Sequence, residues 1–178
     1  LGILHGALAK ARACAPVIVI GDDEARLATA KKLGADITIN INEVDDVVAE
    51  VKRITGGVGV DYVIEAVGTT QTYEQAFKML RRGGKVEAFG IAAQGQTAAL
   101  EPYEFVLGEK KVSGSCAGIG NNWGEAITLL KYGIIDPRPM FSMAVPLAEL
   151  ETALKEIREK KNLVKVFVCP ELKERVYF

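Results

Sequence analysis

The sequence predicts an α/β protein with a three-layer, doubly wound parallel sheet. Short apolar runs of strand length alternate with helix-like segments along the whole chain, a pattern typical of parallel sheets with helices on both faces. The clearest unit covers residues 61–91, where the runs DYVIEAVG and KVEAFGI flank a helical segment with one face formed by Tyr73, Ala76, Phe77 and Leu80. Each run reaches a glycine at its carboxyl end. Ligands of open parallel sheets bind beyond such ends, so we expect a ligand site there.

The other elements follow from local patterns. The run VIVI at 17–20 is β-branched, as buried strands are, and Gly34 ends the helix that follows it. Residues 43–54 repeat apolar side chains at helical intervals, and Pro102 opens a short helix in its first turn. The predicted helix at 122–132 is expected to turn four residues inward, namely Trp123, Ala126, Ile127 and Leu130. The predicted elements are helices at 2–11, 25–33, 43–54, 69–80, 102–107, 122–132 and 146–157, and strands at 17–20, 36–41, 61–68, 85–91, 111–117 and 163–168.

Composition and charge narrow the class of protein. The chain has 178 residues, of which 49% are hydrophobic, and its net charge is −1. That length and composition suit one globular domain with a sizeable core. The sequence has no basic block and no run of about 18 apolar residues, so neither nucleic acid nor a membrane is expected as a partner. Cys14, Cys116 and Cys169 are far apart, which favours a reducing, cytoplasmic location and argues against a disulfide framework or a structural zinc site.

Taken in order, the motifs resemble the cofactor-binding domain of the zinc-type medium-chain alcohol and polyol dehydrogenases. The segments that carry the resemblance are LGILHGALAKA, VIVIGDDEARLATAKKLGAD, TGGVGVDYVIEAVG, LRRGGKVEAFGI, KKVSGSCAG, PLAELETALKEI and KVFV. Each motif alone is weak, but the ordered set covers essentially the whole chain. The resemblance implies a Rossmann fold, with a dinucleotide-binding domain at residues 1–169 and a C-terminal tail at residues 170–178.

Two departures from the family pattern shape the expectations. Gly2 aligns with the last glycine of the family's G-x-G-x-x-G motif, so the first strand and the first two glycines are absent. Because that strand lies at the centre of the family's sheet, we expect the chain to be a fragment of a longer polypeptide. The family's zinc-binding catalytic domain is also absent. We therefore assign no catalytic residue and no metal ligand here, and we interpret the only histidine, His5, as a helix-surface or helix-packing residue.

The resemblance places the adenosine half of the cofactor at four residues. Gly2 is expected to permit close helix–sheet contact beside the pyrophosphate. Gly21 stands where NAD-specific relatives carry the acid that binds the ribose 2′-hydroxyl, and Asp22 is the expected substitute. Because acids repel a 2′-phosphate, NAD is favoured, with NADP still open. The alternative for Asp22 and Asp23 is capping of the next helix. Arg26 is expected to touch the adenosine ribose, and its alternative is a solvated helix charge.

The nicotinamide half is expected at the ends of three later strands. Glu65 lies in the first of these motifs, where we expect it to pack and form hydrogen bonds rather than to act as an acid or base. Cys116 is interpreted as a small strand residue, since no histidine near it in sequence would activate it. The residues expected to border the cofactor are Val67, Gly68, Phe89, Gly90, Ile91, Ser115 and Ala117.

The implied reaction is reversible hydride transfer between a secondary alcohol or polyol and the nicotinamide, with zinc held by residues outside this chain. Two alternatives stay open: a zinc-free quinone or enoyl reductase of the same superfamily, and a nucleotide-binding module without catalysis. Thr97 to Leu100 resembles the short strand that pairs across a subunit interface in relatives, which implies a homodimer or homotetramer. The alternative for this segment is a surface loop.

Overall fold

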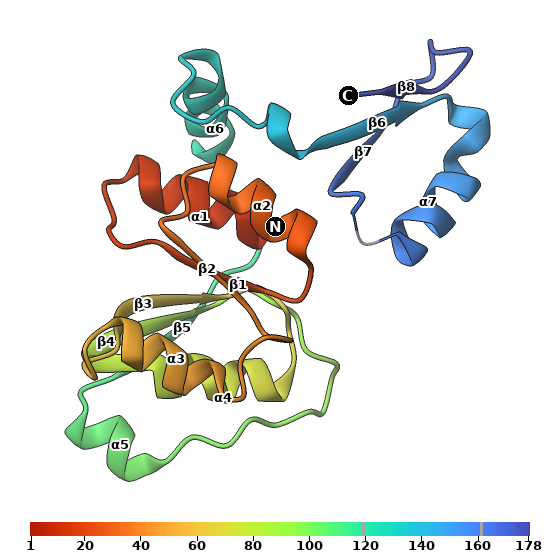
Figure 1. The fold of residues 1–178 in the computed structure, drawn as a ribbon. Coiled ribbons are helices and arrows are strands. Elements are labelled where there is room, and N and C mark those ends of the chain that lie inside the picture. Colours follow the sequence, from red (N-terminus) through yellow and green to blue (C-terminus); the bar gives the residue numbers. More distant parts are fainter. Residues whose placement is uncertain (119, 161) are drawn as a thin grey trace. The chain divides into compact units, whose positions relative to one another are not determined.

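The computed structural model describes residues 1–118, 120–160 and 162–178, and it confirms the α/β class with parallel strands (Figure 1). The chain divides into two compact units. The first unit comprises residues 1–2 and 41–123, and the second comprises residues 3–40 and 124–178.

The first unit is built on a parallel sheet whose strands follow the order β3-β4-β5. Val63, Val86 and Val112 lie side by side across this sheet. Figure 1 shows α3 and α4 together on one side of it. The elements are α3 (Val47–Ile54), β3 (Val60–Glu65), α4 (Thr70–Met79), β4 (Leu80–Ala88), α5 (Pro102–Leu107) and β5 (Lys111–Gly114).

The core of the first unit forms where α4 packs on the sheet. Ala76, Phe77, Leu80 and Val86 pack together and are almost fully buried, with Val63 beside them. Burial of the larger side chains contributes roughly 1.5–3 kcal/mol each. Three of these residues, Ala76, Phe77 and Leu80, belong to the apolar face predicted from helical spacing, so that face is confirmed.

Strand β4 begins at Leu80 rather than at the predicted Lys85. Its register with β3 shifts across this stretch, and Gly83 has a φ of +73° within it. Glycine adopts this left-handed conformation without a Cβ penalty. The Gly83-Gly84 pair, expected to introduce the strand, therefore lies inside it.

The second unit contains two sheets. Strand β1 is parallel to β2, and a separate mixed sheet has the order β7-β6-β8, with β7 parallel and β8 antiparallel to β6. Met143, Val145 and Ala153 form the buried cluster beneath this mixed sheet's helix. The elements assigned around these sheets are α1 (Gly2–Ala11), β1 (Ile18–Gly21), α2 (Glu24–Lys32), β2 (Ile37–Asn40), α6 (Asn122–Lys131), η1 (Arg138–Met140), β6 (Phe141–Val145), η2 (Leu147–Glu149), α7 (Leu150–Glu159), β7 (Lys165–Val168) and β8 (Val176–Tyr177).

The sequence pattern does not predict β6. The run FSMAV is short, lacks clean alternation and lies between Pro139 and Pro146. It becomes the middle strand of its sheet because it pairs with β7 on one side and β8 on the other. The helix predicted from Pro146 is also divided: a 3-10 turn, η2, comes first, and the α-helix begins at Leu150.

Strands β1 and β3 each lie at the edge of a sheet. Within the described residues, β1 pairs with β2 alone and β3 pairs with β4 alone.

Helix α6 does not bury the face predicted to turn inward, so that prediction is wrong. Trp123 is 73% exposed, Ile127 59% and Leu130 50%, Ala126 is exposed as well, and α6 contains no buried residue. Helical spacing shows which side chains share a face, but it does not show what covers that face.

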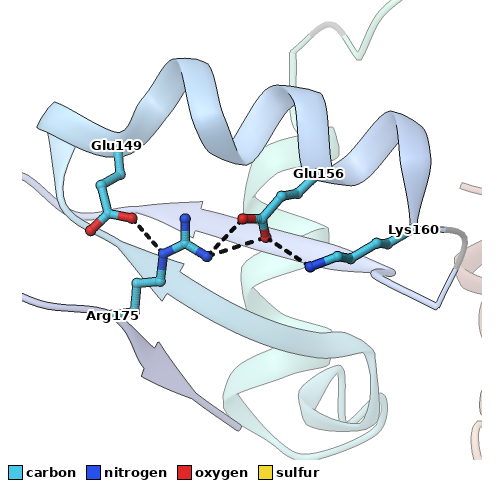
Figure 2. Close-up of polar contacts among 4 residues, drawn as sticks. All are labelled: Glu149, Glu156, Lys160 and Arg175. Atoms are coloured by element: carbon cyan, nitrogen blue, oxygen red, sulfur yellow. Dashed lines mark hydrogen bonds and ion pairs between the residues drawn. The ribbon is translucent and has the colours of Figure 1, made fainter.

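Residues 170–178, expected to be a tail, contribute strand β8 and an ion-pair network. Figure 2 shows Arg175 between Glu149 and Glu156. Its Nη1 donates to Glu156 Oε1 at 3.0 Å, its Nε donates to Glu149, and Lys160 Nζ lies 3.6 Å from Glu156 Oε2. Hydrogen bonds, first of all to Glu149, raise the pKa of Arg175 above its ordinary value. The segment is therefore attached to α7 by charge and to β6 by strand pairing.

Candidate functional site

The loops that follow β3, β4 and β5 lie at one edge of the first unit's sheet, because these strands are adjacent and parallel. Val67 and Ile91 are 69% and 90% exposed. This is the edge where ligands of open parallel sheets bind. The predicted residues that the structure brings to it are Val67, Gly68, Phe89, Gly90, Ile91, Ser115 and Ala117.

Two glycines allow the first two loops to touch. Gly68 has a φ of +89°, and a Cβ added to it would lie 2.6 Å from the carbonyl oxygen of Ile91. A Cβ added to Gly90 would lie 2.5 Å from Glu65 Oε2 and would collide with the backbone of Gly68. Any side chain at either position would therefore separate the loops.

Glu65, the last residue of β3, bonds to both of these loops. Its side chain is buried, with the residue only 3% exposed. Oε1 accepts hydrogen bonds from the backbone N–H groups of Val67 at 2.8 Å and Gly68 at 3.0 Å. Its backbone carbonyl accepts from the N–H groups of Phe89 at 3.0 Å and Gly90 at 2.7 Å. The expectation that Glu65 forms hydrogen bonds within the motif is confirmed by these contacts.

Tyr73 adds a second connection that sequence analysis missed. Its hydroxyl donates to the backbone carbonyl of Gly90. Burial, followed by the charge of Glu65, raises the pKa of Tyr73. The sequence indicated Tyr73 only as one member of the apolar face of a helix. Helix α4 starts at a capping box in which Thr69 and Thr72 bond to each other's backbone N–H groups, and this fixes the turn that carries Tyr73.

The third loop differs from its predicted form. Strand β5 ends at Gly114, so the strand predicted to reach residue 117 is shorter. The N–H of Ser115 donates to the carbonyl of Ala88 on the neighbouring strand at 3.4 Å. Ala117 has a φ of +59°, and Cys116, expected to be a small strand residue, lies exposed beyond the strand.

The predicted adenosine residues lie in the second unit around the end of β1. Gly21 is the last residue of β1, and a Cβ added there would lie 3.2 Å from Leu27 Cδ2. Asp23 caps α2, because its Oδ1 accepts from the N–H of Arg26 at 2.9 Å. Asp22 is exposed and is not the capping residue. Sequence analysis left helix capping open for both acids. In the structure, Asp23 is the cap of α2 and Asp22 is not.

Helix α1 approaches β1 closely at Gly6, and the role expected of Gly2 beside the pyrophosphate stays a prediction. Gly2 is the first residue of α1, and a Cβ added to it would have no atom within 4 Å. A Cβ added to Gly6, by contrast, would lie 3.0 Å from Val19 Cγ2 on β1. His5 lies between them on α1 and is partly buried, and this burial lowers its pKa.

The resemblance implies a zinc ion whose ligands were expected to lie outside this chain. Within residues 1–118, 120–160 and 162–178, no three His, Cys, Asp or Glu side chains come together so as to hold a metal ion. No step through zinc is therefore assigned to them.

A hollow of about 440 Å³ lies in the second unit, between α2 and the β7-β6-β8 sheet, and none of the predicted site residues lines it. Across the same described residues, no helix is both long and apolar enough to cross a membrane.

Adjacent parallel strands whose following loops gather at one edge, and the likeness to solved dehydrogenase structures, define a Rossmann-type domain, the cofactor-binding architecture of dehydrogenases. The sequence model of the family described as zinc-binding dehydrogenase matches residues 1–132. The chain belongs to this family.

Similar proteins agree with this assignment. An alcohol dehydrogenase from Cupriavidus necator is 36% identical over 133 residues, which cover 73% of this chain and 36% of that protein. An erythritol/L-threitol dehydrogenase from Mycolicibacterium smegmatis is 32% identical over 173 residues, or 96% of this chain and 46% of that protein. The structure of benzyl alcohol dehydrogenase from Acinetobacter calcoaceticus matches with a TM-score of 0.86 and 26% identity, covering 94% of this chain and 46% of that one. The chain thus spans less than half the length of these relatives.

Proposed function

We propose that the chain is the nicotinamide-cofactor-binding part of a zinc-dependent dehydrogenase that transfers a hydride between a secondary alcohol or polyol and NAD. The observation that supports this best is the convergence of three predicted loops at the carboxyl edge of the β3-β4-β5 sheet. The bound cofactor would supply the hydride acceptor. The residues of this chain would bind and orient it, with residues 1–169 as the cofactor domain.

NAD is the proposed cofactor rather than NADP. Asp22 is exposed directly after β1, and Asp23 caps α2. An exposed acid at this point favours a ribose 2′-hydroxyl, which donates a hydrogen bond, over a 2′-phosphate, which the acid repels. Arg26, in the first turn of α2, is proposed to touch the same ribose.

The proposal is tested by calorimetric titration of the full-length protein that contains this chain with NADH and NADPH. We expect NADH to bind more tightly. Tighter binding of NADPH would contradict the proposed role of Asp22, and no binding of either would contradict the proposed function. Turnover of secondary alcohols and polyols with NAD, with loss of activity when zinc is chelated, separates a zinc-dependent dehydrogenase from a zinc-free reductase.

We further propose that residues 97–100 pair with the same segment of a second subunit. They are exposed and form no strand within the chain, and the N–H of Ala99 donates to Glu74 Oε1 at 2.9 Å. Alternate N–H groups of an extended segment point in opposite directions, so Ala98 and Leu100 are the expected donors to a partner. Light scattering tests this proposal: Ala98→Pro should reduce the oligomeric mass, and an unchanged mass would contradict it. A cytoplasmic location stays a prediction.

A further inference from the structure

We propose that Glu65 is a positioning residue, which holds the loops after β3 and β4 in one relative position so that both present their backbones to the nicotinamide end of the cofactor. This inference rests on the proposed function. It assigns a task to a buried carboxyl group that the hydride-transfer chemistry itself does not use.

The first support is that Glu65 contacts both loops at once. The side chain bonds to the N–H groups of Val67 and Gly68, and the main chain of the same residue bonds to those of Phe89 and Gly90. Gly68 N also lies 3.2 Å from Oε2, so both carboxyl oxygens are engaged. A single residue therefore determines the distance between two loops that are more than 20 positions apart in sequence.

The carboxyl group of Glu65 is also buried. Glu65 is one of the few buried charged residues among those described, with 3% exposure. A buried carboxyl group is costly to keep unless its oxygens are satisfied, and here backbone N–H groups satisfy them. A side chain so enclosed does not reach a substrate, which excludes a direct acid–base role in this conformation.

The loops after β3 and β4 are also packed too closely to move apart or rotate freely. Gly68 and Gly90 leave no space for a Cβ, and the Tyr73 hydroxyl holds the Gly90 carbonyl from the side of α4. With the carbonyl of Gly90 held by Tyr73 and its N–H held by Glu65, the peptide groups of this loop have a set direction. Backbone groups with a set direction can bind an amide such as the nicotinamide carboxamide without first being ordered.

Glu65→Gln tests the inference with little change of volume. An amide nitrogen in place of one oxygen would face the N–H of Gly68 donor to donor, which the buried site cannot relax by hydration. We expect the affinity for NADH to fall about 10-fold, as the loss of one well-made buried hydrogen bond implies. The affinity for ADP, which lacks the nicotinamide, should stay within about 2-fold of the original.

Calorimetry or fluorescence titration of the full-length protein with NADH and ADP gives both affinities. Glu50→Gln is the matched control, because Glu50 lies in the same unit and pairs with Arg53 on α3 rather than with a loop. Equal losses for NADH and ADP, or no loss for either, would overturn the positioning role. If the wild-type protein binds neither NADH nor NADPH, the proposed function fails instead, and the two failures are thus distinguishable.

Tyr73→Phe keeps the inference testable if Glu65→Gln does not fold. It removes only the hydroxyl that donates to Gly90, and a thermal melt reports whether the variant is folded. We expect a smaller loss of NADH affinity in the same direction, again without a loss for ADP. An unchanged ratio of NADH to ADP affinity in folded Tyr73→Phe would overturn the inference.

Discussion

Two networks attach irregular segments to sheets in this protein, and they use charge in different ways. In the first unit, Glu65 accepts hydrogen bonds from backbone N–H groups in a buried site. In the second unit, Arg175 joins two carboxylates on η2 and α7 (Figure 2). Its side chain is 21% exposed. The first network depends on where the backbone goes. The second depends on the charges of side chains, so solvent and pH affect it more directly.

The two networks also differ in their relation to the proposed cofactor site. The Glu65 network lies beneath loops proposed to bind a cofactor, where a displacement of a fraction of an ångström matters. The Arg175 network attaches the last residues of the chain and touches none of the predicted site residues. Changes to the first should therefore alter binding and stability together, whereas changes to the second should alter stability alone.

The largest effect is expected for Gly90→Ala. The added methyl would lie 2.5 Å from Glu65 Oε2, and such overpacking costs about 3 kcal/mol or more when backbone has to move. Urea denaturation measures the change in unfolding free energy. Gly124→Ala is the control, since a Cβ there would meet no atom within 4 Å and alanine favours the helix α6. Equal effects of the two substitutions would contradict the close contact at Gly90.

A smaller effect is expected for Arg175→Met, which removes the cation between Glu149 and Glu156. The variant should melt at a lower temperature than the wild type, and the difference should shrink as sodium chloride is added, because salt screens ion pairs that are partly exposed to solvent. Affinity for NADH should not change. A difference that is independent of salt would show that packing of the side chain, rather than its charge, attaches the segment.

The same network should weaken in acid. The hydrogen bond from Arg175, followed by the charges nearby, lowers the pKa of Glu156. A carboxyl group whose pKa is lower in the folded state stabilises the fold at pH values above its unfolded pKa, and this contribution is lost as pH falls through the folded pKa. The melting difference between wild type and Glu156→Gln should therefore be full near neutrality and shrink below about pH 4. A constant difference between pH 7 and pH 3 would contradict this linkage.

The smallest effect separates two neighbouring acids. Asp23→Ala removes the N-cap of α2, which should cost about 1 kcal/mol of unfolding free energy. Asp22→Ala should keep this cap, which Asp23 provides, and reduce the preference for NADH over NADPH. Both are measured by denaturation and titration of the same preparations. A larger loss of unfolding free energy from Asp22→Ala than from Asp23→Ala would show that the cap had been assigned to the wrong residue.

Much of the fold could be predicted from the sequence, because alternating apolar runs and helical spacing are local signals. They indicated strand β3, helix α4 and the loop glycines Gly68 and Gly90. They did not indicate β6, since a strand of five residues between two prolines becomes recognisable only when its partners pair with it. The inward face predicted for α6 was wrong for a related reason: an apolar stripe needs a covering surface, and spacing alone does not supply one.

By itself, the sequence determined the class of fold, the order of most of its elements and the glycine-containing loops at the carboxyl ends of β3 and β4. Only the tertiary structure decided which groups meet there. The bond from Tyr73 to Gly90 spans 17 positions and that from Arg175 to Glu149 spans 26, so neither follows from neighbouring residues. Propensity and periodicity act over one or two turns of chain, whereas these contacts depend on how sheets and helices pack. The task of Glu65 therefore became visible only once both loops had been placed around it.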